Sequence, residues 1–331
     1  MIGEEKALRG LFTRIAVILL FLVLFFNIYS AVYVAREGLI SLVSRFGDAI
    51  WLDCITDIFC SLLYFLSLFL PALIFYVLTP KSERISIDFS MRLSSPGTLF
   101  KTATILFLSI GTIVCFSNLN IWLVPSFSAG ASITQNQEPY QLILLMFSGA
   151  VIPAFAEELL FRGVLITHLK PYGKGTAVLV SAFLFGVMHM NLSQLLYATA
   201  AGVVLGVVYV STNSFWLCFL IHFANNLFNL AESYMFQIFR SEEANLICML
   251  AEITIFALGI LFALGYVLSA KKKKATPRPL GVFGKTQAVE VGRSVDGVGT
   301  LEAFFCPAMI IYLAFAVLNM LYAFGVRYFG L

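Results

Sequence analysis

The sequence predicts an all-α, polytopic integral membrane protein, a helical bundle of about eight or nine transmembrane helices. Of the 331 residues, 60% are hydrophobic and only 12% are charged, and the mean hydropathy is +0.93. No soluble globular chain of this length has such a composition. The apolar stretches are also about 20 residues long, which is the length that a helix needs to cross a hydrocarbon core of about 30 Å.

Nine apolar stretches follow one another along the chain. The first, 15–34, is too long for a signal-peptide core and lacks a small-residue cleavage site, so we expect it to be a retained span. The others cover 55–78, 101–124, 140–169, 176–190, 193–210, 214–239, 246–270 and 304–325. The six cysteines form no CxxC pair, which argues against a cysteine-bound metal.

The basic residues predict how the chain is oriented in the membrane. They concentrate before the first stretch and after the second, fourth and eighth, whereas the other gaps hold few. By the positive-inside rule the N-terminus is cytoplasmic and the C-terminus lies outside. The segment 271–302 is then a basic cytoplasmic loop, whose partner is anionic lipid rather than nucleic acid. A compact chain without an organelle retention tail favours the plasma membrane of a prokaryote.

The most informative residues are two adjacent glutamates in the fourth stretch, Glu157 and Glu158, with Arg162 one helical turn later. A carboxylate near the middle of a bilayer costs about 3 kcal/mol, so such a group usually faces a partner or a wet cavity. Glu158 and Arg162 stand at i and i+4 with the acid N-terminal, which favours an intrahelical ion pair. Glu157 points about 100° away and is left to act as a base. A purely structural ion pair is the alternative interpretation.

Two of the three histidines also lie in apolar stretches. His189 is on the fifth stretch, and His222 is on the seventh with Asn226 at i+4. At 1.5 Å per residue from the cytoplasmic ends, Glu157, His189 and Asn226 are roughly 20 Å deep and His222 roughly 14 Å. Unrelated residues would scatter over about 30 Å. We therefore expect a catalytic cavity between three central helices.

Three motifs in order carry a resemblance to a known family. The runs EELLFR (157–162), SAFLFGVMH (181–189) and GVVLGVVYVSTNSFWLCFLIHFANN (202–226) resemble the motifs EExxxR, FxxxH and HxxxN of the CPBP intramembrane proteases. That family includes the type II CAAX prenyl endopeptidases and the bacterial Abi proteins of bacteriocin processing and self-immunity. The resemblance covers about 140–230, so we expect N-terminal transmembrane helices over 1–139, a catalytic core over 140–230 and C-terminal transmembrane helices over 231–331.

The resemblance implies an endopeptidase that hydrolyses a peptide bond of a membrane-associated protein or peptide, lipidated or not. Glu157 and His189 would hold and deprotonate a water molecule, and Glu158 with Arg162 would brace that base. His222 and Asn226 would stabilise the oxyanion of the tetrahedral intermediate. The expected partners are the lipid bilayer and a peptide or membrane-protein substrate that enters from the cytoplasmic side.

Three further expectations complete the interpretation. There is no HExxH helix, and a water-activating glutamate with an oxyanion hole needs no ion, so we expect a metal-free site. Glu157, His189 and His222 could instead hold zinc, with water in the fourth position.

A non-catalytic binding, immunity or transport protein of the same fold also stays open, although the internal repeats typical of transporters are absent from the sequence. His168, near a cytoplasmic helix end, is expected to be solvated.

Overall fold

The computed structural model describes residues 2–47, 50–87, 89, 96–123, 139–272 and 297–329. Over these ranges the chain forms helices joined by turns and contains no strand, which confirms the all-α prediction. Most of the expected basic loop, residues 273–296, lies outside the described ranges.

The helices follow the order of the apolar stretches. The N-terminal part contains α1 (Ile2–Val43), α2 (Ile50–Leu78), a 3-10 turn (Lys81–Glu83) and α3 (Pro96–Leu123). A segmented central helix follows, with α4 (Pro139–Met146), a π-helical stretch (Phe147–Val151), α5 (Ile152–Glu158), a second π-helical stretch (Leu159–Ile166), α6 (Thr167–Leu169) and a 3-10 turn (Lys170–Tyr172). The remaining helices are α7 (Lys174–Met188), α8 (Leu192–Thr212), α9 (Phe215–Ile238), α10 (Ser241–Lys272), α11 (Gly297–Phe304) and α12 (Pro307–Phe329).

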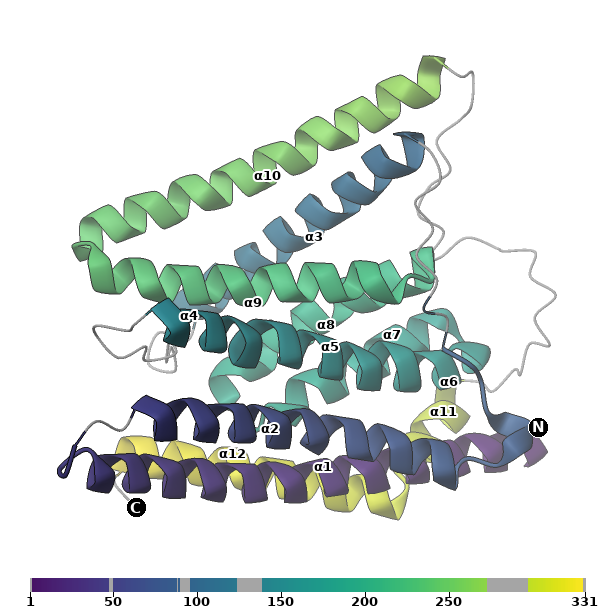
Figure 1. Ribbon diagram of the computed structural model, residues 1–331. Coiled ribbons are helices and arrows are strands. Elements are labelled where there is room, and N and C mark those ends of the chain that lie inside the picture. The colour runs from purple at the N-terminus through teal and green to yellow at the C-terminus, as the bar shows by residue number, and fades with distance from the viewer. Residues whose placement is uncertain are drawn as a thin grey trace.

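The helices form three groups, as Figure 1 shows. α1, α2 and α12 lie together along one side of the bundle, and α3 and α10 lie along the opposite side. The central helix, α7, α8 and α9 fill the space between these two groups. The N-terminal end of α1 and the C-terminal end of α12 lie at opposite ends of the bundle. The expected catalytic motifs lie on the central helix, α7 and α9, which belong to the middle group.

Six helices of the described part are long and apolar enough to cross a membrane, namely Gly3–Val43, Ile50–Leu78, Lys101–Leu119, Leu142–Tyr172, Gln194–Thr212 and Ser241–Leu268. Two further apolar helices, Lys174–Met188 and Pro307–Tyr322, are shorter. α9 has the length of a span, but His222 and three asparagines lower its mean hydropathy. Long apolar helices in this number indicate an integral membrane protein, with fewer clear spans than the eight or nine that the sequence predicts.

The C-terminal half of the central helix is enclosed by its neighbours. Every residue from 156 to 169 is buried, including the charged side chains of Glu157, Glu158 and Arg162. By contrast, α10 and α12 keep many large apolar side chains exposed, as expected of surfaces that face lipid. The motif glutamates therefore lie in the protein interior rather than at its lipid-facing surface.

α7 and α8 approach each other closely because glycines lie between them. A Cβ atom on Gly202 would stand 2.8 Å from the Cα of Ala182, and one on Gly186 would stand 2.7 Å from the carbonyl oxygen of Leu195. Small residues at such positions let two helix backbones pack directly on each other. The close approach fixes α7, which carries His189 at its C-terminal end, against α8.

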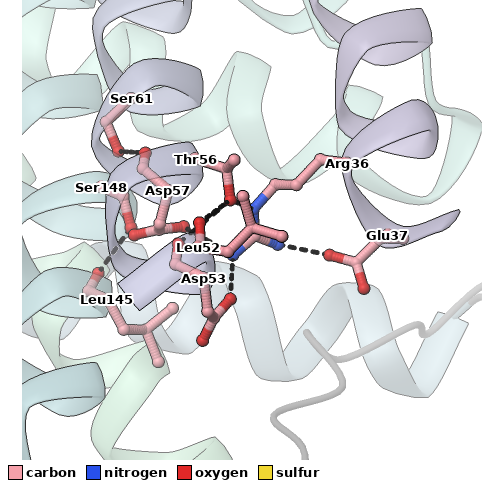
Figure 2. Close-up of polar contacts among 9 residues, drawn as sticks. All are labelled: Arg36, Glu37, Leu52, Asp53, Thr56, Asp57, Ser61, Leu145 and Ser148. Atoms are coloured by element: carbon pink, nitrogen blue, oxygen red, sulfur yellow. Dashed lines mark hydrogen bonds and ion pairs between the residues drawn. The ribbon is translucent and has the colours of Figure 1, made fainter. Parts of the chain in front are cut away.

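A polar network joins α1 to α2 (Figure 2). The Arg36 guanidinium contacts Asp53 at 2.5 Å and Asp57 at 3.7 Å and also pairs with Glu37, and its Nε donates to the Thr56 hydroxyl at 3.1 Å. A charged group that is this enclosed, with 10% of its side chain exposed, is stable only when it is paired. The network explains why α1 continues to Val43, beyond the span end expected at 34.

Candidate active site

The expected ion pair forms the base of the site. Arg162 Nη1 donates to Glu158 Oε1 at 2.8 Å, and its Nη2 donates to the carbonyl oxygen of Gly202 at 3.4 Å. The guanidinium also lies over the Phe185 ring, 4.8 Å from its centroid, in a cation–π contact. Glu158 is 0% exposed and Arg162 is 1% exposed, so the pair is shielded from water. The i, i+4 prediction for these two residues is confirmed.

Glu158 has a second partner on α9. The Nδ1 of His222 donates to Glu158 Oε1 at 2.9 Å, so one carboxylate oxygen binds both Arg162 and His222. This contact joins two of the three motif helices directly. Since Nδ1 binds this carboxylate, Nε2 is the ring nitrogen of His222 that faces Glu157.

Glu157 lies beside this cluster and is held differently. Its Oε1 accepts a hydrogen bond from the Tyr64 hydroxyl at 2.9 Å, while its Oε2 lies 3.7 Å from His222 Nε2. The Oε2 atom is buried and has no hydrogen-bond partner, and the whole residue is 4% exposed. A buried carboxylate oxygen without a partner is rare in a folded protein and calls for a water molecule or a reacting group.

The π-helical stretches flank these glutamates on the central helix. One ends at Val151 and the other begins at Leu159, directly after Glu158. Such widened turns are uncommon in helices and are found most often near functional sites. Their position favours a functional interpretation of this segment over a purely structural one.

His189 ends α7 and has its own orientation fixed. Its Nδ1 lies 2.8 Å from the carbonyl oxygen of Phe185, and because a carbonyl only accepts, Nδ1 carries the proton. This contact leaves Nε2 as the ring nitrogen that can meet another group. The rings of His189 and His222 lie 5.1 Å and 5.8 Å from that of Phe185, so the two histidines flank one aromatic side chain.

α7, α8 and α9, with Ile113 of α3, enclose a small cavity that several motif residues line. It has a volume of about 120 Å³, and His189, His222 and Asn226 all contribute to its wall. Asn225 also lines it and donates to the Tyr197 hydroxyl at 2.6 Å. The structure thus brings the FxxxH histidine and the HxxxN pair to one cavity, which the buried Glu157, Glu158 and His222 cluster adjoins.

The zinc alternative can be compared with this geometry. Over the ranges that the structure describes, no three His, Cys, Asp or Glu side chains converge as a metal ion requires. The set Glu157, His189 and His222 therefore does not fit a zinc ion as it stands, and no step is derived through one. Metal independence itself stays a prediction.

Residues 139–228 match the family model described as type II CAAX prenyl endopeptidase, Rce1-like. The chain therefore carries an Rce1-like domain. This match confirms the family resemblance of the three motifs. No curated protein and no solved structure matches the chain. The Rce1-like domain runs from α4 into α9 and contains every expected site residue, whereas α1, α2 and α12 lie outside it.

Two features of the site were not expected from the sequence. Tyr64 comes from α2, outside the Rce1-like domain, and belongs to no motif. The one signal that could have found it is its hydroxyl, because a hydroxyl in the middle of an apolar helix needs a polar partner. The expectation for His168 was wrong. It is 6% exposed, its Nδ1 donates to the Val164 carbonyl at 2.8 Å, and its ring packs against Phe75.

Proposed function

We propose that the protein is an intramembrane endopeptidase that hydrolyses a peptide bond of a membrane-associated protein or peptide. The observation that carries this proposal is the position of Glu157 Oε2: like Glu158 Oε2 it is buried without a hydrogen bond, but it alone of the two lies 3.7 Å from His222 Nε2, beside the cavity of the other motif residues. A buried carboxylate oxygen that accepts no hydrogen bond from the protein is available to take a proton from a water molecule. We assign to these residues the roles that the family resemblance implies.

In the proposed reaction, Glu157 and His189 hold a water molecule, and Glu157 Oε2 takes one of its protons as the water oxygen attacks the substrate carbonyl carbon. The negative charge then moves to the carbonyl oxygen. His222, through Nε2 when that atom carries a proton, and Asn226, through its amide N–H, donate to this oxyanion. The carbon–nitrogen bond breaks, and the leaving amine receives the proton from Glu157. The products are a free carboxylate and a free amine.

The supporting residues act through their neighbours. Glu158 and Arg162 form a shielded pair that holds His222 by its Nδ1 atom and so directs Nε2 towards Glu157. Tyr64 holds the other oxygen of Glu157 and leaves Oε2 free. Preorganisation of this kind in a water-poor site is worth about 3 kcal/mol for each donor that meets the oxyanion.

The arrangement in the membrane is part of the same proposal. All nine apolar stretches, including α7, α9 and α12, cross or enter the plasma membrane of a prokaryote, with the N-terminus in the cytoplasm and the C-terminus outside. The catalytic cavity then lies between α7, α8 and α9, beside the central helix that carries Glu157. The substrate is a peptide or membrane protein that reaches it from the cytoplasmic side, and the reaction needs no metal ion.

The test is cleavage of a peptide library by the protein purified in detergent, with mass spectrometry of the products. Glu157→Ala should abolish cleavage while the circular dichroism spectrum stays unchanged. Glu252→Ala is the matched control, because Glu252 is a glutamate of α10 that pairs with Asn118, away from the cluster. Cleavage that survives in Glu157→Ala would refute the proposal and would favour a non-catalytic binding, immunity or transport role.

A further inference from the structure

A second cavity lies next to the candidate active site and is not explained by the motif residues. It has a volume of about 350 Å³ and lies between α1, α2, α12 and the turn that follows α7. α1 contributes Phe26, Asn27, Tyr29 and Ser30, while Tyr64 of α2 and Asn319 of α12 complete the wall with the turn at residues 188–190. We call it the α1 cavity.

Two residues connect the α1 cavity to the reacting groups. His189 lines both this cavity and the smaller one that holds His222 and Asn226. Tyr64 lines the α1 cavity and donates directly to Glu157 Oε1 at 2.9 Å. The α1 cavity therefore begins where the water-activating pair is proposed to lie.

The two cavities differ in volume and therefore in what they can hold. The smaller one, about 120 Å³, lies below the range of about 300–1,000 Å³ that is typical of ligand sites, whereas the α1 cavity, about 350 Å³, lies within it. The smaller cavity has room for the reacting groups and water. A substrate side chain next to the scissile bond fits the α1 cavity.

The lining of the α1 cavity is aromatic and carries no full charge. None of the described residues in its wall is Asp, Glu, Lys or Arg. The Tyr64 ring lies 5.6 Å from that of Phe26 and 5.5 Å from that of Tyr29, so three rings form a continuous apolar surface. Asn27, Ser30 and Asn319 add uncharged polar groups. A charged side chain would find no counter-ion there, and a bulky apolar one would find aromatic surface.

The turn after α7 is shaped to form this wall. Met190 has a φ of +47°, in the left-handed region that residues with a side chain seldom adopt. This conformation reverses the chain directly after His189, so Met188, His189 and Met190 all face the cavity. Strained backbone of this kind is found most often at functional sites.

We propose that the α1 cavity is the specificity pocket of the protease, and that it takes an uncharged, bulky apolar or aromatic side chain of the substrate residue next to the scissile bond. This inference rests on the endopeptidase function proposed above. It makes α1 and α2, which lie outside the Rce1-like domain, the elements that select the substrate.

The test uses peptides that vary one residue on either side of the bond that the unmodified protein cleaves. Ser30→Trp fills the cavity and should lower the ratio of kcat/KM for a Phe peptide over an Ala peptide about tenfold. Ile28→Trp is the matched control, because Ile28 is exposed like Ser30 but does not line the cavity and lies on the opposite face of α1. Its ratio should stay that of the unmodified protein.

A second variant keeps the test decisive if Ser30→Trp does not fold. Ser30→Asp, a much smaller change at the same position, puts a carboxylate into the wall and should raise cleavage of a Lys peptide relative to a Phe peptide about tenfold. If the cavity variants keep the peptide preferences of the unmodified protein, or if Ile28→Trp changes them equally, the α1 cavity is not the specificity pocket. The proposed endopeptidase function is unaffected by that result as long as Glu157→Gln abolishes cleavage. Cleavage that does not depend on Glu157 would overturn both.

Discussion

Removal of the Arg162 side chain tests the electrostatic core of the site. Arg162→Met keeps an unbranched side chain but removes the contacts of the guanidinium with Glu158, the Gly202 carbonyl and the Phe185 ring. Glu158, which is 0% exposed, then keeps its contact with His222 at 2.9 Å but loses the positive charge beside it. Breaking a buried pair in this way costs about 3–5 kcal/mol, because an uncompensated charge stays in the interior.

The assay is the free energy of unfolding in mixed detergent micelles, measured by titration with sodium dodecyl sulfate. The double variant Glu158→Gln with Arg162→Met removes both charges of this pair and keeps an acceptor for His222, so it should regain about 1–3 kcal/mol over the single variant. Arg240→Met, at an exposed arginine, should change the free energy of unfolding by about 0.5 kcal/mol or less. A loss below about 1 kcal/mol in Arg162→Met, or a double variant less stable than the single one, would refute the reasoning.

Three further predictions follow from the contacts of the site. Tyr64→Phe removes the donor to Glu157 Oε1 and should lower kcat about tenfold at unchanged KM, measured by steady-state cleavage; an unchanged kcat would contradict the positioning role. Gly202→Ala should destabilise the protein by about 1–3 kcal/mol, because its Cβ would stand 2.8 Å from the Ala182 Cα. Gly38→Ala is the control, since Gly38 has open space around it and the substitution should not destabilise the protein. Equal unfolding curves for the two variants would contradict the close packing. Cleavage should persist in a zinc chelator, and a loss that added zinc restores would show that a metal takes part.

Local patterns in the sequence predicted the parts of the site that depend on one helix. The ion pair of Glu158 and Arg162 was predictable because residues at i and i+4 always share a helix face. Helix depth also predicted that His222 approaches the glutamates, since residues at one depth on neighbouring helices can meet. The catalytic roles of these residues and the domain boundaries stay predictions.

Contacts between distant segments could not be predicted. Tyr64 is 93 residues away from Glu157 in the chain, and although its hydroxyl needs a polar partner, nothing in α2 indicates that this partner is Glu157. Arg36 was taken to lie beyond the end of the first span because it is charged, but Asp53 and Asp57 of α2 compensate that charge and let the helix continue. His168 was expected to be solvated because it lies near the cytoplasmic end of its helix, but packing against Phe75 buries it.

The central claim is that Glu157 activates a water molecule to cut a peptide bond. The most direct measurement is cleavage of the best library peptide in water labelled with oxygen-18, followed by mass spectrometry of the new carboxyl terminus. We predict one labelled oxygen in the product of the unmodified protein, and a rate lower by about a thousandfold or more in a folded Glu157→Gln variant. Label incorporation at the same rate in both proteins would contradict the claim.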